Sequence, residues 1–420
     1  MVERTASTPA RGLCAGILTR WLETGEFPDR MLPHAHPANA LIQEIVFGSL
    51  RWYGALQWRI KQLVPRDPDL LTMGFLLTGF YQLCHMDNIP PHAAVNETIE
   101  AAKHTLDPAR CRFLNAVLRN ALRQKDSLET KMLTAPRAAQ WSHPAILIQR
   151  WQQTFGPEKT QALCNWNNQR PTVSLRVFAE ADAPSRAHMD ALPPHPTNPE
   201  HFRLVPPGVP VQSLPGFKEG AFYVQDPATE LAVELLDPRP GMQLLDACAA
   251  PGGKTFACAA RMQNKGNIIA IDRHLDRLER MAENIKRMPF SIIHMQRADA
   301  TRSVELPQGP FDRILLDVPC SNSGVLQRRP DARWRITEER IATLADLQQR
   351  FLDATAPLLA RQGVLVYSTC SLEPEENEKC VQAWIAHNPG YTLCDMRLSL
   401  PPESGMDGAF AARIERNPNT

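Results

Sequence analysis

Residues 243–255 read Gln-Leu-Leu-Asp-Ala-Cys-Ala-Ala-Pro-Gly-Gly-Lys-Thr, and this stretch decides the fold. Its first residues form a short apolar run of the kind found in buried strands. Small residues with one proline and two glycines follow, and a helix-period segment begins near Lys254. The stretch therefore predicts a strand, a tight turn and a helix, which together open a βαβ succession.

The same alternation of strand and helix continues toward the C-terminus. Strands are expected at residues 243–247, 267–271, 291–296, 313–318 and 363–368, with helices at 254–263, 275–288 and 338–359. Such a succession predicts an α/β fold with a parallel, doubly wound sheet. In that architecture ligands lie beyond the carboxyl ends of the strands, where the strand order reverses.

Small, acidic or reactive residues follow each of the five expected strands, so we expect them to meet at one edge of the sheet. The turn after the first strand lacks bulky side chains, and its backbone can approach the carboxylate and ribose of a nucleoside ligand. Asp272 can accept from two ribose hydroxyls and Asp299 from an adenine amino group. The expected nucleoside-binding residues are Cys248, Ala249, Ala250, Pro251, Gly252, Gly253, Lys254, Asp272, Asp299 and Asp317.

Other nucleotide-binding motifs and a purely local role are the alternatives for this edge. The turn does not match the spacing of a phosphate loop or of a dinucleotide fingerprint. A single acid at a strand end is more often a helix cap or a surface group. Three acids after successive strands favour a binding edge instead.

Residues 10–135 show helix-period apolar spacing, which predicts an all-helical region. Candidate helices are 12–23, 38–53, 58–63, 70–84, 94–105 and 110–124. On the last of these, Arg112, Arg119 and Arg123 share one face, and no acidic residue lies between positions 110 and 125. This basic face is either a solvated surface or a stripe that binds phosphates.

Proline-rich residues 136–215 separate the two halves. They carry a short helix at 144–155 and one strand-like run at 172–178. We therefore expect three domains: an all-α domain at 1–138, a small mixed α/β connector at 139–215 and the large α/β domain at 216–420.

Composition narrows the class of protein. The chain has 420 residues, 43% of them hydrophobic, which is enough for two or three domains with large cores. Residues 1–10 form no apolar signal segment, and no run is long enough to span a membrane. Ten cysteines without a CxxC pair argue against zinc and against a disulfide framework. We expect a cytoplasmic, metal-free monomer with reduced cysteines; the net charge of +1 neither supports nor excludes RNA.

The motifs resemble the Sun/Fmu family of bacterial 16S rRNA cytosine-C5 methyltransferases, which have a NusB-like N-terminal domain. The resemblance covers nearly the whole chain. In the α/β half it is carried by Leu214–Phe217, Val224–Asp226, Cys248–Thr255, Arg313–Asp317, Cys320-Ser321, Gly324-Val325, Pro330-Asp331, Trp334, Tyr367–Ser371 and Pro374–Asn377. In the helical half it is carried by Phe47-Gly48, Leu50-Arg51, Tyr81–Leu83, Pro90–Ala94, Glu97-Thr98 and Asn115–Arg119.

The resemblance implies a class I (Rossmann-like) methyltransferase that uses S-adenosyl-L-methionine and acts on 16S rRNA. It also implies a covalent step, because a thiolate added to C6 of cytosine turns the ring into an enamine that attacks a sulfonium methyl group. Cys370 is implied as the nucleophile, and Cys320 as the residue that assists release of the adduct. Asp317 can accept from the cytosine amino group or stabilise a protonated N3.

Several further residues are expected to contact RNA. Lys254 and Asp226 resemble positions that touch the target base, although a helix-start cation and a turn-forming carboxylate are alternatives. The basic segment after Cys320 can contact phosphates and stack a base, or form a solvated loop. Its expected RNA contacts are Arg328, Arg329, Arg333 and Trp334.

The chain departs from the family pattern at three places. These are Val318, Val177-Phe178 and Ala409-Phe410-Ala411, where the last keeps one of three expected aromatic positions. Two other functions stay open: methylation of another RNA such as tRNA, and a non-catalytic RNA-binding scaffold.

Overall fold

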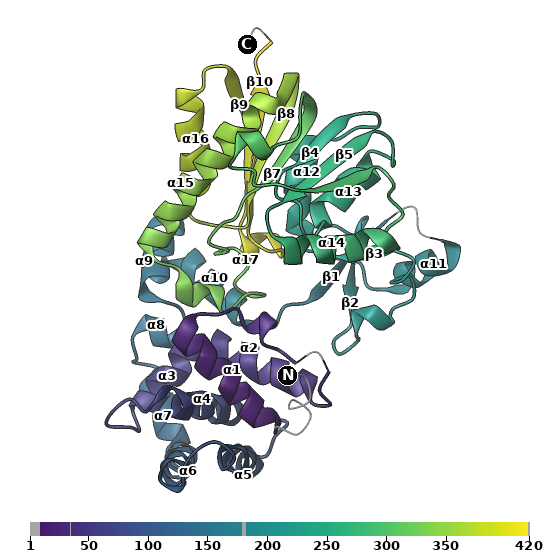
Figure 1. The fold of residues 1–420 in the computed structure, drawn as a ribbon. Coiled ribbons are helices and arrows are strands. Elements are labelled where there is room, and N and C mark those ends of the chain that lie inside the picture. Colours follow the sequence, from purple (N-terminus) through teal and green to yellow (C-terminus); the bar gives the residue numbers. More distant parts are fainter. Residues whose placement is uncertain (1–8, 34, 179–181, 419–420) are drawn as a thin grey trace. The chain divides into compact units, whose positions relative to one another are not determined.

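The structure is a computed structural model that describes residues 9–33, 35–178 and 182–418 (Figure 1). Residues 1–8, where we expect no signal segment, lie outside the described residues. The chain divides into two compact units, Met1–Arg170 with Leu326–Arg335, and Pro171–Val325 with Ile336–Thr420. The expected connector at 139–215 is thus divided between the two units. We call them the helical unit and the catalytic unit.

The helical unit consists of helices joined by short turns. The helices are α1 (Ala10–Thr24), α2 (Asn39–Arg51), α3 (Tyr53–Lys61), α4 (Leu70–His85), α5 (Pro91–Ala102), α6 (Pro108–Arg123), α7 (Lys125–Met132), α8 (Arg137–Gln140), α9 (Ala145–Phe155) and α10 (Pro157–Asn168). The six helices expected between residues 10 and 124 are present within a few residues of their expected bounds. Helices α7, α8 and α10 were not expected from the sequence.

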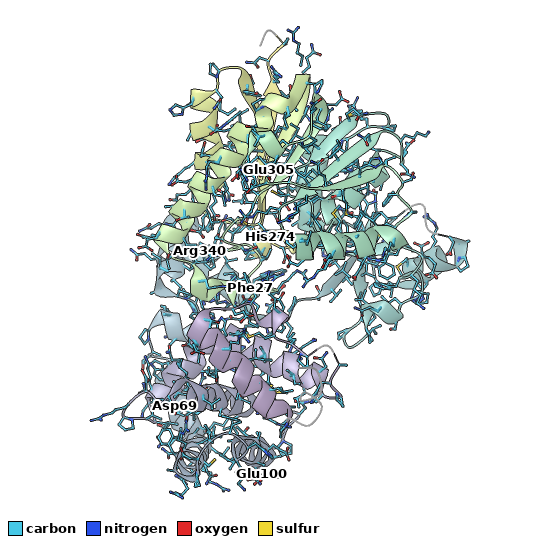
Figure 2. The ribbon with its side chains drawn as sticks, in the orientation of Figure 1. Phe27, Asp69, Glu100, His274, Glu305 and Arg340 are labelled. Atoms are coloured by element: carbon cyan, nitrogen blue, oxygen red, sulfur yellow. The ribbon has the colours of Figure 1, made fainter. Side chains whose placement is uncertain are left out.

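Helix α4 forms the centre of the helical unit and packs against α1, α2, α3, α5 and α6. Its residues 72–82 are all buried, as expected for a helix that is apolar or small on every side. Asp69, labelled in Figure 2, caps this helix by accepting from the Thr72 N–H at 3.1 Å. Gly74 permits close approach of α1, because a Cβ there would lie 2.5 Å from the Ala15 carbonyl oxygen.

Residues 326–335 follow the catalytic unit's Val325 in sequence, yet they fold as part of the helical unit. Arg333 is completely buried and donates to the carbonyl oxygens of Arg51 (3.1 Å), Ser142 (3.0 Å) and Asn167 (3.0 Å). Burial lowers the pKa of Arg333 to about 9, so the guanidinium is still charged at neutral pH. Trp334 donates from its indole nitrogen to the Leu50 carbonyl at 2.8 Å.

The catalytic unit is built on a seven-stranded sheet with the order β6-β5-β4-β7-β8-β10-β9. Its strands are β4 (Gln243–Asp246), β5 (Asn267–Asp272), β6 (Ile293–Arg297), β7 (Phe311–Asp317), β8 (Leu359–Thr369), β9 (Tyr391–Ser399) and β10 (Ala409–Arg416). The first five pair in parallel, which confirms the expected doubly wound sheet. Strands β9 and β10, which were not among the expected strands, add an antiparallel edge.

Helices follow β4, β5, β7, β8 and β9, while β6 continues to β7 over the described residues 298–310 without an α-helix (Figure 1). One further helix, the first of those named next, precedes β4. The helices are α12 (Glu230–Leu236), α13 (Gly253–Arg261), α14 (Leu275–Arg287), α15 (Glu338–Thr355), α16 (Glu378–His387) and the short α17 (Pro401–Ser404). The chain runs outward from β4 through β5 to β6 and then returns to β7 on the other side of β4. The strand order therefore reverses between β4 and β7.

A small antiparallel sheet precedes the large one in the catalytic unit. Its central strand β1 (Val173–Val177) pairs with β2 (Phe202–Val205) and β3 (Phe222–Val224), and α11 (Ala183–Ala191) lies between β1 and β2 in sequence. Arg176 on β1 is buried and forms an ion pair with Glu230 at the start of α12.

The departures from the family pattern fall at packed positions. Phe178 is buried, with its ring 5.2 Å from that of Phe290. Val318 is buried directly after β7. Ala409, Phe410 and Ala411 are buried on β10, which lies between β8 and β9.

The buried arginine gives a stability test of the helical unit. We expect Arg333→Ala to destabilise this unit by about 3 kcal/mol, because it leaves several buried carbonyls without donors. Arg329→Ala is the matched control, since Arg329 is exposed and its ion pair with Asp29 spans 3.5 Å. Urea unfolding followed by circular dichroism measures both variants. Equal stability of the two variants would contradict the structural role of Arg333.

Candidate active site

The turn expected to bind a nucleoside lies at the strand-order reversal, between the end of β4 and the start of α13. Gly252 has a φ of 109°, a left-handed conformation that glycine adopts without strain. A Cβ at this position would also lie 2.6 Å from the ring of Phe256, and one at Gly253 would lie 3.1 Å from the Gln225 side-chain nitrogen. The backbone and its packing thus both require glycine at Gly252.

Carboxylates line this edge at the ends of β4 and β5. Asp246 is fully buried, its Oδ2 accepts from Thr255 Oγ1 at 2.7 Å, and its Oδ1 has no hydrogen-bond partner. Burial raises the pKa of Asp246 to about 7. Asp272 is also buried; its Oδ1 accepts from the N–H of His274, labelled in Figure 2, at 2.9 Å. Its Oδ2 lies 3.5 Å from Arg277 Nη1.

Asp299 follows β6 and makes local hydrogen bonds. Its Oδ1 accepts from the N–H of Thr301 at 3.0 Å and from that residue's hydroxyl at 2.7 Å. Its own N–H donates to the carboxylate of Glu305, also labelled in Figure 2. Asp299 thus caps a local turn, and binding of an adenine amino group stays a prediction.

Two thiols meet beyond the ends of the neighbouring strands β7 and β8. Cys320 Sγ and Cys370 Sγ are 3.2 Å apart, and both cysteines are free. Cys370 Sγ also lies 3.1 Å from Asn322 Oδ1, and the Asn322 side chain donates to the Cys320 carbonyl at 3.1 Å. The hydrogen bond with Cys370, together with burial, raises the pKa of Cys320 well above its usual value. Cys320 therefore has a high proton affinity.

An ion pair stands beside the thiols. Lys254 Nζ at the start of α13 lies 2.7 Å from Asp317 Oδ2 at the end of β7. Burial alone would lower the pKa of Lys254, but the negative charge of Asp317 raises it above its ordinary value. The Cys370 thiol acts on Lys254 in the same direction. The structure thus brings the four expected catalytic side chains into one group.

Some expected RNA contacts are placed elsewhere. Arg333 and Trp334 pack inside the helical unit, where Trp334 also stacks edge-on with Tyr53 at 5.1 Å between ring centroids. A fully buried guanidinium cannot reach a phosphate, so Arg333 is not placed to make this contact, whereas the contact expected of the half-buried Trp334 stays a prediction. Arg329 is exposed and Arg328 is half-buried, and both stay predictions.

Asp226 forms a turn, which is the alternative to base contact that the sequence left open for it. Its Oδ1 accepts from the N–H of Ala228 at 2.9 Å and from that of Asp407 at 3.0 Å. These bonds cap the 3-10 turn Pro227–Thr229 and attach the segment before β10. Contact with the target base is untested.

The basic face on α6 is present. Its three arginines are exposed, and Arg119 and Arg123 bond to the side-chain oxygens of Asn115 and Asn120, respectively. Asp107 starts the helix by accepting from the Arg110 N–H at 2.9 Å.

The sequence interpretation missed three residues at the site, namely Asp246, Asn322 and Glu376. Asp246 has a visible signal, because it is an acid at the end of the strand that opens the fold. Asn322 has none beyond its neighbourhood to the Cys320 motif, whereas Glu376 stands in the Pro374–Asn377 motif that carries the family resemblance. Across the residues that the structure describes, no three potential metal ligands cluster, and no helix is long and apolar enough to cross a membrane.

Comparisons with known proteins agree with this geometry. The family model of the 16S rRNA methyltransferase RsmB/F matches residues 233–415, and the NusB family model matches residues 8–123. The ferredoxin-like domain of the RsmF/B-like methyltransferases matches residues 143–181.

Individual relatives cover almost the whole chain. The ribosomal RNA small subunit methyltransferase B of Citrobacter koseri is 36% identical over 426 residues, which is 96% of this chain and 98% of that protein. The crystal structure of PH0851 is 25% identical, with a TM-score of 0.79 over 98% of this chain and 99% of that chain. A methyltransferase homolog protein from Pyrococcus horikoshii is 28% identical, with a TM-score of 0.59 over 68% of this chain and 99% of that one. The chain belongs to the ribosomal RNA small subunit methyltransferase B family.

Proposed function

We propose that this chain transfers a methyl group to carbon 5 of a cytosine in 16S ribosomal RNA, through a covalent bond between Cys370 and C6 of the base. The observation that carries the proposal is the pair of thiols 3.2 Å apart, beside the Lys254–Asp317 ion pair. One sulfur can attack the base as a nucleophile, and the other can accept the proton that is removed from C5. The family's named activity on small-subunit rRNA supports the choice of RNA.

S-adenosyl-L-methionine is the proposed cofactor, and the residues at the strand-order reversal fit it. Gly252 and Gly253 add no side chains to the turn, and the N-terminus of α13 presents backbone N–H groups that suit a carboxylate. The unpartnered Oδ1 of Asp246 suits an ammonium group, and the buried carboxylate of Asp272 suits ribose hydroxyls. When bound, the cofactor supplies an electrophilic methyl group.

The chain's own residues then divide the chemistry. The Cys370 thiolate forms a bond to C6, and the electron pair of the C5–C6 double bond becomes available at C5. Asp317 accepts from the cytosine amino group or stabilises a protonated N3, and the proton at N3 offsets the negative charge that thiolate addition brings to the ring. Lys254 holds Asp317 in place at 2.7 Å.

Release of the product breaks the bond between Cys370 and C6. Cys320 acts here in its thiolate form: it takes the proton from the methylated C5 and becomes the thiol, and its raised pKa makes that thiolate a strong base. The electron pair of that C–H bond restores the C5–C6 double bond and expels the Cys370 thiolate. The target base must leave its stack for this sequence, because attack at C6 comes from the face of the ring.

The two alternatives are weaker. A non-catalytic scaffold has no use for two adjacent thiols and an ion pair at one strand edge. The relative named as a small subunit methyltransferase aligns over 98% of its length, which includes the NusB-like helical domain. This shared domain disfavours a tRNA substrate.

Single cysteine variants test the division of labour. We expect Cys320→Ala to attack the base and then stall before elimination, so a covalent protein–RNA adduct should accumulate. Cys370→Ala and the double variant should show no adduct and no methyl transfer. Denaturing electrophoresis after incubation with 16S rRNA and S-adenosylmethionine measures the adduct. An adduct with Cys370→Ala, and none with Cys320→Ala, would reverse the two roles.

The basic face of α6 is proposed to bind RNA phosphates. Replacing Arg112, Arg119 and Arg123 together by Ala should weaken RNA binding and reduce the slope of log affinity against log salt by up to about 3. The triple Lys variant is the control, since it keeps the charge and should keep the slope. Filter binding across salt concentrations gives the slope. Equal slopes for the Ala variant and the native protein would assign these arginines to a solvated surface.

A further inference from the structure

Each reactive cysteine is followed directly by a serine, and one buried carboxylate holds both serines. Glu376 lies in the loop between β8 and α16 and is fully buried. Its Oε1 accepts from the Ser321 N–H at 2.9 Å. Its Oε2 accepts from the hydroxyl of Ser371 at 2.6 Å and from that of Ser321. The two hydroxyl oxygens are 3.0 Å apart.

The partners of this carboxylate, as far as the described residues show them, are neutral donors. Gln348 on α15 donates its side-chain N–H to Glu376 Oε1 at 3.1 Å and to the Pro319 carbonyl at 3.0 Å. Burial raises the pKa of Glu376. A carboxylate placed in the interior without a cation costs free energy, and its hydrogen bonds are what offset that cost. A purely structural site could use an apolar side chain here.

The sheet itself does not set the separation of the two sulfur atoms. The parallel ladder between β7 and β8 pairs residues up to Asp317 and Ser368. Beyond it, the Val318 N–H bonds the Ser368 carbonyl at 3.0 Å, and both cysteines lie past this point in loops. Glu376 joins the residue after one cysteine to the residue after the other, next to the direct contact of the two serine hydroxyls and the bond from the Gly324 N–H to the Cys370 carbonyl at 2.9 Å.

We propose that Glu376 is a positioning residue for methyl transfer, which fixes the two thiols relative to each other by holding Ser321 and Ser371 on one carboxylate. The proposal rests on the proposed roles of Cys320 and Cys370. Neighbouring contacts support the same loop: the Asn377 side chain accepts from the Thr369 hydroxyl at 2.6 Å and donates to the Ser371 carbonyl at 2.9 Å.

The geometry distinguishes between two substitutions of Glu376. Glu376→Gln can keep its amide oxygen at the place of Oε1, facing the Ser321 N–H and Gln348, and can donate its amide N–H groups to the two serine hydroxyls. Glu376→Ala removes every one of these bonds. If position is what matters, Gln restores function and Ala does not.

The test compares steady-state kinetics of the full-length variants on 16S rRNA. Glu376→Ala should lower kcat by roughly 100-fold, the scale for a displacement of about 1 Å between reacting groups, with little change in the KM for RNA or cofactor. Glu376→Gln should stay within about fivefold of the native kcat, the scale of one neutral hydrogen bond. Glu375→Ala is the control, because Glu375 is partly exposed and pairs with Lys379 at the surface.

A second readout isolates the attack step. In the Cys320→Ala background, adduct formation should slow with Glu376→Ala and not with Glu376→Gln. Ser371→Ala, which removes one hydroxyl from the carboxylate and changes little volume, should lower kcat by about tenfold, the scale of a hydrogen bond to a charged group, and it serves if Glu376→Ala does not fold. Native kcat in Glu376→Ala, or native kcat in Ser371→Ala where Glu376→Ala does not fold, would overturn the proposal. So would a Gln variant as impaired as Ala, since charge and not position would then be required.

Failure of the underlying function gives a different pattern. If Cys370→Ala keeps its activity in the same assay, the cysteine mechanism is wrong whatever the Glu376 variants do. If Cys370→Ala is inactive while Glu376→Ala is fully active, only the positioning role is wrong.

Discussion

The parallel ladder of the catalytic unit stops at the carboxyl ends of β4, β7 and β8, and the proposed chemistry depends on what lies just beyond. Strand order reverses between β4 and β7, so helices and loops leave the sheet in opposite directions there. The gap receives the glycine turn from one strand and the Asp317 carboxylate from the next. The Lys254–Asp317 ion pair then joins the two across the reversal. Thiols from β7 and β8 complete the group because those strands are neighbours.

Each unit contains a buried charged side chain whose hydrogen bonds hold nearby segments in place. In the helical unit, the guanidinium of Arg333 is held by backbone carbonyls, and in the catalytic unit the carboxylate of Glu376 is held by hydroxyl, amide and backbone donors. A charge removed from water must have its hydrogen bonds satisfied, so each of these residues fixes the geometry of the segments around it. Both residues act on the stretch of chain that follows Cys320, because Glu376 bonds to Ser321 and Arg333 belongs to that stretch.

The sequence predicted the parts of this protein that depend on local periodicity. The five parallel strands, their helices and the edge that carries Cys320, Cys370, Asp317 and Lys254 follow from apolar runs and from what stands at their ends. The antiparallel strands β9 and β10 were missed, since their pattern is not bounded by helices as in βαβ units. The burial of Arg333 was missed because a run of arginines looks solvated, and nothing local indicates that it folds into another unit. Glu376 stands in the Pro374–Asn377 motif that carries the family resemblance, but its role was missed because Ser321 and Gln348 lie 55 and 28 residues away from it in sequence.

The central claim is that the Cys370 sulfur bonds to C6 of cytosine. The most direct test uses 16S rRNA transcribed with 5-fluorocytidine, because fluorine at C5 cannot leave in place of the proton and the adduct is trapped. Trypsin releases the two cysteines in separate peptides, residues 314–328 with Cys320 and residues 362–379 with Cys370. After nuclease and trypsin digestion, mass spectrometry should find the methylated fluorocytidine nucleotide on peptide 362–379. The same nucleotide on peptide 314–328 would contradict the account.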